Sequence, residues 1–126
     1  MKIGELVKGM QHIGLPTENI EETIRFYDGL GFTVAYRTES GKCAFLKLQN
    51  VMIETYEVQT AAGISGAINH IALDVADVEK AFALAKEQQL EIVSNGVEAL
   101  PFWDNGVKFF IVLGPNGERV EFNQYL

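Results

Sequence analysis

The sequence lacks several features that would assign it to a class at once. It has a single cysteine, Cys43, so no disulfide can form within the chain, and a reducing, cytoplasmic location is expected. Basic residues are few, with 10 Lys and Arg against 17 Asp and Glu, and the net charge of −7 argues against nucleic acid or an anionic membrane as partner. No apolar run is long enough for a secretory signal or a membrane-spanning helix. A globular domain without nucleic acid or an anionic membrane as partner is therefore expected.

The chain contains one internal repeat. A shift of 58 positions places residues 11–15 on residues 69–73, and it places Asn19 on Asp77. The match is one of pattern more than of identity, and it predicts two related modules. We expect a single domain over residues 1–126, with one module at about 8–60 and the other at about 66–126.

The later part of the repeat needs a different shift. A shift of 67 positions places residues 43–46 on 110–113 and residues 52–55 on 119–122. The second half therefore has nine extra residues, which we expect in a loop near residues 94–105.

Each module is predicted to contain a strand, a helix and three further strands. Asn19 and Asp77 stand where a helix N-cap is expected, with carboxylates in the first turn that follows. The predicted strands are 11–15, 33–38, 44–48 and 51–57 in the first module, and 68–75, 91–94, 107–113 and 119–124 in the second. The predicted buried helix faces are Ile20, Ile24 and Tyr27, and Val78, Phe82 and Ala85.

Four chemically active residues occupy equivalent positions in the repeat. The two histidines of the chain, His12 and His70, match each other on the first strand of each module, and Glu54 matches Glu121 on the last strand. Two imidazoles and two carboxylates form a mixed nitrogen and oxygen ligand set that suits divalent Zn, Ni, Co, Fe or Mn. The sequence therefore predicts a metal site of His12, Glu54, His70 and Glu121.

Each of these residues alone also has a purely structural interpretation. A histidine on a strand often has no ligand, and a glutamate between apolar neighbours can simply face water. Because side chains alternate along a strand, Ile53 and Val120 are expected to face the helix, and Glu54 and Glu121 the opposite face. The equivalence of the positions favours the metal site.

Other residues are weaker candidates. Cys43 falls at the start of the predicted strand at about 44–48 and has no third histidine to activate it, so no nucleophilic role is expected. Asp74 is expected to end a strand. Phe102 and Trp103 lie in the inserted loop, where they either wall a pocket or form a satellite hydrophobic cluster.

The sequence resembles the vicinal oxygen chelate superfamily. The resemblance rests on three segments: His-Ile-Ala-Leu-Asp-Val at 70–75, the predicted turn and strand at 114–122, and the predicted helix at 21–27 followed by Leu-Gly-Phe at 30–32. The resemblance covers nearly the whole chain after about Lys8. It implies an α+β fold in which two tandem βαβββ modules form a curved, barrel-like mixed sheet around a metal site.

Within that superfamily, the ligand set is most similar to that of glyoxalase I (lactoylglutathione lyase). The resemblance implies one divalent metal, a homodimer, and isomerisation through an enediolate with Glu121 as the base and Glu54 as its partner. Pro16 stands where bacterial glyoxalase I enzymes carry an arginine, and Val58 where they carry an asparagine, and both of those residues help to anchor glutathione. The substrate is therefore left open, as a small hydroxycarbonyl or a thiol adduct.

Two other functions compete with a metal-dependent lyase or isomerase. One is an Fe(II) ring-cleaving dioxygenase that uses His12, His70 and Glu121 as a facial triad. The other is a metal-free small-molecule binding protein of the resistance type. The retention of all four ligands, with no further histidine for a dioxygenase pocket, favours the lyase or isomerase.

Overall fold

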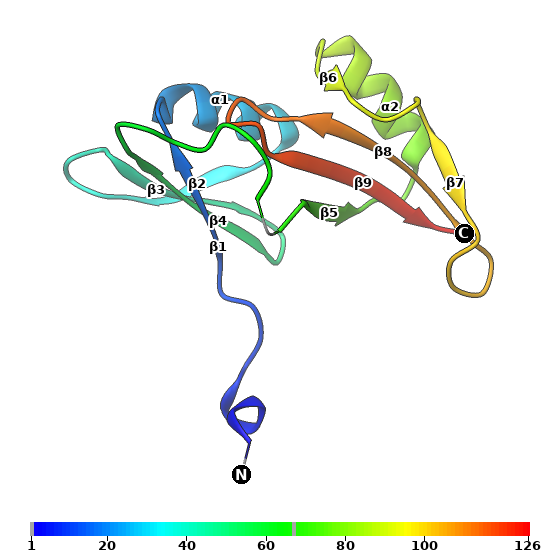
Figure 1. Cartoon of the computed structure of the whole chain (residues 1–126), viewed down its shortest axis with the longest axis horizontal. Coiled ribbons are helices and arrows are strands. Elements are labelled where there is room, and N and C mark those ends of the chain that lie inside the picture. Colours follow the sequence, from blue (N-terminus) through cyan, green and yellow to red (C-terminus); the bar gives the residue numbers. More distant parts are fainter. Residues whose placement is uncertain (1, 67) are drawn as a thin grey trace. The chain divides into compact units, whose positions relative to one another are not determined.

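A computed structural model describes residues 2–66 and 68–126 of the chain. They divide into two compact units, residues 1–59 and 60–126. Each unit pairs one α-helix with one β-sheet (Figure 1), which confirms the mixed α+β class.

The first unit has the predicted order of strand, helix and three strands, preceded by a short 3-10 helix. Its elements are η1 (Ile3–Leu6), β1 (Ile13–Thr17), α1 (Ile20–Leu30), β2 (Thr33–Arg37), β3 (Cys43–Leu48) and β4 (Val51–Glu57). The strand order in the sheet is β1-β4-β3-β2, with β1 parallel to β4 and the other pairs antiparallel. The crossover through α1 therefore brings the first strand beside the last.

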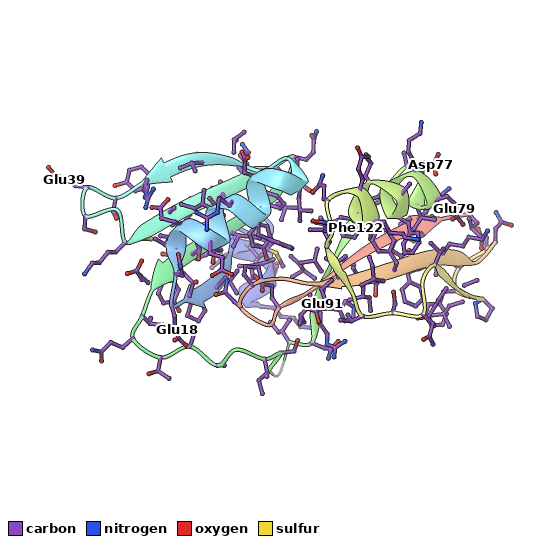
Figure 2. All side chains as sticks on the ribbon, turned by 90° about the horizontal axis from the view of Figure 1, so that it is seen from above. Glu18, Glu39, Asp77, Glu79, Glu91 and Phe122 are labelled. Carbon is purple, nitrogen blue, oxygen red and sulfur yellow. The ribbon has the colours of Figure 1, made fainter. Side chains whose placement is uncertain are left out.

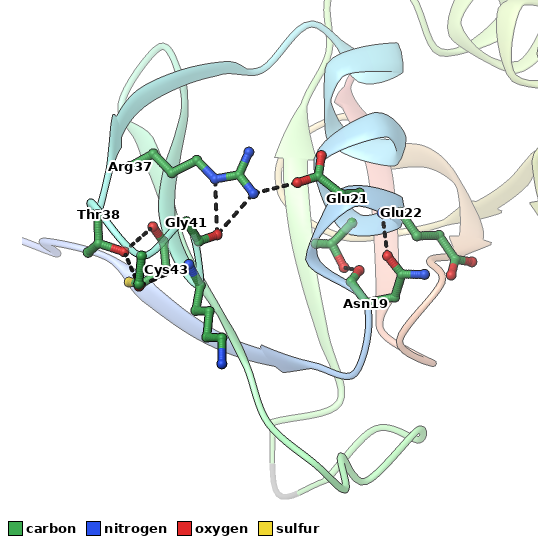
Figure 3. A network of polar contacts seen from close by, with 10 residues as sticks. Asn19, Glu21, Glu22, Arg37, Thr38, Gly41 and Cys43 are labelled. Atoms are coloured by element: carbon green, nitrogen blue, oxygen red, sulfur yellow. Dashed lines mark hydrogen bonds and ion pairs between the residues drawn. The ribbon is translucent and has the colours of Figure 1, made fainter.

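Helix α1 begins and ends at the predicted signals. The Asn19 side chain accepts a hydrogen bond of 3.1 Å from the Glu22 backbone N–H (Figure 3), and the helix ends at Gly31, whose φ of +104° favours glycine. Ile20 and Tyr27 are buried as expected. Thr23 is buried instead of Ile24, because its hydroxyl reaches the Thr17 hydroxyl at 2.9 Å.

Polar contacts of Arg37 join the β2–β3 hairpin to α1. The Arg37 guanidinium donates to the Gly41 carbonyl at 2.9 and 3.0 Å and also pairs with Glu21 in the first turn of the helix (Figure 3). These contacts fix the hairpin against the helix. The hairpin belongs to the same sheet as β4, which carries Glu54.

The second unit repeats the arrangement. Its elements are β5 (His70–Asp74), α2 (Val78–Glu87), β6 (Glu91–Ile92), β7 (Glu98–Leu100), β8 (Val107–Leu113) and β9 (Arg119–Tyr125). The strand order is β5-β9-β8-β6, with β7 also paired to β8, and β5 runs parallel to β9. Asp77 caps α2 (Figure 2) by accepting from the Lys80 backbone N–H at 3.0 Å.

The core of the second unit lies between α2 and its sheet. Val78 and Ala85 are buried as predicted, and the half-buried Phe82 packs edge-to-face on Phe110 with ring centroids 5.2 Å apart. Phe110 in turn stacks on Phe122 at 4.9 Å.

Two sequence expectations need correction. The nine extra residues do not form only a loop, because they include β7, which pairs with β8 from Glu98↔Phe109 to Leu100↔Val107. The repeat alignment of the third strand is also wrong by one position. Phe45 pairs with Glu54 as Ile111 pairs with Glu121, so the shift between β3 and β8 is 66 and not 67. The longer turn before β9 hid this in the sequence.

The sheets also differ from the expected single barrel-like sheet. Hydrogen bonds link the strands into two separate sheets, one per unit, and the described residues form no closed barrel. Within residues 2–66 and 68–126, no helix has the length and apolar character needed to cross a membrane.

Candidate functional site

The first unit brings His12 and Glu54 together. His12 lies just before β1, and its neighbouring strand is β4, in which Glu54 pairs with Gly14. The His12 Nε2 atom is 3.4 Å from Glu54 Oε1, and the imidazole and the Phe45 ring form a T-shaped pair with centroids 5.6 Å apart. The parallel β1–β4 pairing therefore forms this pair from residues that are far apart in the sequence.

The second unit forms the equivalent pair. His70 is the first residue of β5, and Glu121 lies on the parallel neighbour β9, opposite Ala72. The His70 Nε2 atom is 3.7 Å from Glu121 Oε1.

The predicted orientation of the strands that carry the glutamates is confirmed. Ile53 and Val120 are buried in the cores of their units, whereas Glu54 and Glu121 are only partly buried. The side chains of Glu54 and Glu121 are 29% and 12% exposed, so both carboxylates are partly shielded from water.

An amide side chain orients each imidazole, and the sequence reasoning missed both amides. His12 Nδ1 lies 2.9 Å from Gln11 Oε1, and His70 Nδ1 lies 3.0 Å from Asn69 Oδ1. An amide oxygen accepts a hydrogen bond from Nδ1–H and leaves the lone pair on Nε2, which faces the glutamate. The signal was present, because both amides precede their histidine at equivalent repeat positions.

The second oxygen of each glutamate has a different partner in the two units. Asn123 donates its side-chain N–H to Glu121 Oε2 at 2.9 Å, whereas the Cys43 thiol reaches Glu54 Oε2 at 3.6 Å. Burial, together with the hydrogen bond and negative charge of Glu54, raises the pKa of Cys43 above its usual value. Neither partner was anticipated, since Asn123 has Tyr56 as its repeat equivalent and so no repeated amide marks it.

The donor chemistry of each pair fits a cation. Nε2 and the carboxylate oxygen both present lone pairs, which repel each other unless a proton or a metal ion lies between them. Adjacent ligands at about 2.1 Å from one ion are themselves roughly 3.0–3.4 Å apart, a range that includes the first pair and falls slightly below the second. Among residues 2–66 and 68–126, no three or more His, Cys, Asp or Glu side chains gather as a metal site, so each unit offers a pair of ligands.

The other residues that the sequence singled out do not belong to the two His–Glu pairs. Asp74 ends β5 as predicted. Pro16 lies within β1, and the Val58 N–H donates to the Thr17 carbonyl at 2.9 Å. Trp103 and its neighbour Phe102 line a cavity in the second unit, which is the pocket-wall alternative considered for them.

The chain belongs to the Glyoxalase/Bleomycin resistance protein/Dioxygenase superfamily, which it matches over residues 9–122. This membership confirms the resemblance to the vicinal oxygen chelate superfamily. An uncharacterized protein of Bacillus subtilis (strain 168), YwbC, is 28% identical over 94% of this chain and 99% of its own length.

Solved structures show the same fold. A glyoxalase family protein from Enterococcus faecalis is 23% identical, with a TM-score of 0.76 over 94% of this chain and 98% of that chain. Lactoylglutathione lyase from Agrobacterium tumefaciens is 17% identical, with a TM-score of 0.70 over 94% of each chain. At these identities the likeness describes the fold, and the reaction has to be argued from the site.

Proposed function

We propose that the protein is a divalent-metal-dependent lyase or isomerase of the glyoxalase type, acting on a small hydroxycarbonyl or a thiol adduct. The observation that carries the proposal is the repeated pair, in which an imidazole oriented by an amide presents Nε2 to a glutamate at 3.4 Å in one unit and 3.7 Å in the other. We propose that His12, Glu54, His70 and Glu121 together bind one ion of Ni, Co, Zn, Mn or Fe, and that the chain acts as a homodimer in the cytoplasm.

The bound metal would supply Lewis-acid stabilisation of negative charge on the substrate oxygens. The protein residues supply ligand orientation and proton transfer. Gln11 and Asn69 hold the Nδ1 protons of the two histidines, so that both Nε2 lone pairs stay available.

Glu121 is proposed as the base. Asn123 donates to its Oε2 atom, which fixes the carboxylate in one orientation with Oε1 toward His70, and once displaced from the metal Oε1 could accept a proton. Glu121 removes the proton from the carbon that carries the hydroxyl group, and it returns the proton to the neighbouring carbon of the enediolate. Glu54, whose Oε2 atom accepts from the Cys43 thiol at 3.6 Å, is proposed as the partner carboxylate.

The surroundings of β1 and β4 disfavour a glutathione adduct as substrate. A tripeptide with two carboxylates needs polar or basic anchors. The equivalent positions here are Pro16 and Val58, which offer no such side chain.

Metal binding and proton transfer are tested separately. Isothermal titration of the metal-free protein with Ni, Co, Zn and Mn should give a saturable site that weakens at least tenfold in H12Q and H70Q. The matched control is E57Q on strand β4, which removes an exposed carboxylate and should bind metal as the wild type does.

Proton transfer is followed by NMR in D₂O with hydroxycarbonyls and hemithioacetals. The wild type should exchange the carbon-bound proton of at least one substrate class, and E121Q at saturating metal should lose this exchange more completely than E54Q. A protein that binds metal but leaves the whole panel unchanged would refute the lyase or isomerase proposal. A protein that binds no metal would refute the metal site and favour the small-molecule binding alternative.

A further inference from the structure

A cavity of about 130 Å³ lies within the second unit, beside Glu121. Asn123, which hydrogen-bonds Glu121, is part of its wall, as is Asp74, the residue opposite Asn123 in the parallel β5–β9 register. Two residues of a strand span about 7 Å, so the cavity begins one side chain away from the proposed base.

Aromatic rings form the outer wall of this cavity. Trp103 and Tyr125 meet edge to face, with centroids 6.0 Å apart and planes inclined at 73°, and Phe102 also lines the space. The rings are open to solvent, and Trp103 is 76% exposed. Exposed aromatic clusters commonly mark binding sites, so the three large rings around this cavity indicate that it binds a ligand.

The loop that carries Trp103 is built to hold it there. Trp103 has φ of +62°, an uncommon conformation for a bulky side chain. The β7–β8 pairing closes the loop at Leu100↔Val107, and the Leu126 N–H donates to the Gly106 carbonyl at 3.1 Å (Figure 1 shows this loop near the C-terminal end of β9). The loop lies in the segment before β8 that is longer in the second half of the repeat than in the first.

The charge at the cavity comes from Asp74. Its carboxylate is exposed and has no hydrogen-bond or ion-pair partner in the described part of the chain. The face of an aromatic ring attracts a cation within about 6 Å, and aromatic rings combined with a carboxylate are suited to methylated ammonium groups. An anionic ligand would instead be repelled by Asp74 and by the net charge of −7.

We propose that this cavity binds a compact organic cation of the methylated ammonium class. Asp74 pairs with the positive charge, and the ring faces of Trp103 and Tyr125 contact the methyl groups. Apolar cavities of about 150 Å³ accommodate a molecule the size of benzene, so a trimethylammonium group fits the space. The further step, that the substrate of the neighbouring Glu121 carries this cation, rests on the proposed function.

The test uses Trp103 as its own reporter, because it is the single tryptophan of the chain. Metal-free wild-type protein is titrated with choline, with its neutral isostere 3,3-dimethylbutan-1-ol, and with the anion 3,3-dimethylbutanoate, at constant ionic strength. Choline should change the tryptophan emission saturably, the alcohol should bind at least tenfold more weakly, and the anion should give no saturable change.

Variants then test whether the carboxylate of Asp74 pairs with the positive charge of choline. D74N should weaken choline binding about fivefold and leave binding of the alcohol unchanged, which corresponds to loss of one partly exposed ion pair. D28N, which removes an exposed carboxylate from α1, is the matched control and should bind choline as the wild type does.

Equal affinity for choline and the alcohol, or no saturable response to choline, would overturn the proposal. Emission that depends on protein concentration and not on choline would overturn it as well, and would assign the rings to self-association. Because the titration needs neither metal nor turnover, its failure is distinct from a failure of the proposed reaction.

Discussion

Asn123 and Cys43 provide a matched comparison between the two halves of the proposed metal site. Each side chain donates to the Oε2 atom of a glutamate. The Asn123 amide is 2.9 Å from Glu121 Oε2, whereas the Cys43 thiol is 3.6 Å from Glu54 Oε2. We therefore predict that N123A weakens metal binding much more than C43A.

The magnitudes follow from the donors. A hydrogen bond from a neutral donor to a charged group contributes about 1.5–3 kcal/mol, and Glu121 is shielded enough, at 12% exposure, to retain the lower part of that range. A loss of about 1.4 kcal/mol is tenfold in affinity, so N123A should raise the metal Kd about tenfold. A thiol is a weak donor, and C43A should change the Kd less than about threefold.

The assay is competitive titration of the metal-free variants with Zn and Co in the presence of a chelator of known affinity. N50A, in the exposed turn between β3 and β4, is the control for removal of an asparagine and should leave the Kd unchanged. An effect of C43A equal to or larger than that of N123A would refute the reasoning, because the two carboxylates would then be anchored equally.

Three further predictions concern the thiol, a helix cap and the core. Alkylation of Cys43 by iodoacetamide should be slow at pH 8 and accelerate only at higher pH, because its raised pKa leaves little thiolate. E54Q should move the midpoint of that pH profile downward, and an unchanged midpoint would contradict the contribution of the carboxylate. N19A should lower the free energy of unfolding by about 1 kcal/mol in urea denaturation, because the helix loses its N-cap. N19S should be as stable as the wild type, and equal stabilities of N19A and N19S would show that the cap contributes nothing. F110A should cost about 3–5 kcal/mol, whereas F102A at the exposed loop should cost less than about 0.5 kcal/mol, and similar losses in the two variants would contradict the assigned core.

Most secondary structure was predictable because its signals are local. Asn19 and Asp77 begin the helices as expected, and strands β4 and β8 have the predicted bounds. The burial of Ile53 and Val120 was also predictable, since alternation along a strand is a property of the backbone.

The errors occurred where a distant contact decides the outcome. Strand β7 was missed because its pairing with β8 depends on a hairpin closed at Leu100 and Val107. Thr23 was left out of the buried helix face because its partner, the Thr17 hydroxyl, belongs to another element.

The amino-acid sequence was enough to predict the mixed α+β class, the repeated module and the equivalence of His12 with His70 and of Glu54 with Glu121. These follow from residue identity and periodicity, which are local. The fold was needed to place β1 beside β4 and β5 beside β9, which brings each imidazole to its carboxylate. It also placed Asn123 on Glu121 and Trp103 against Tyr125. Such contacts depend on strand order and register, which are decided by the packing of whole elements and not by the residues near each site.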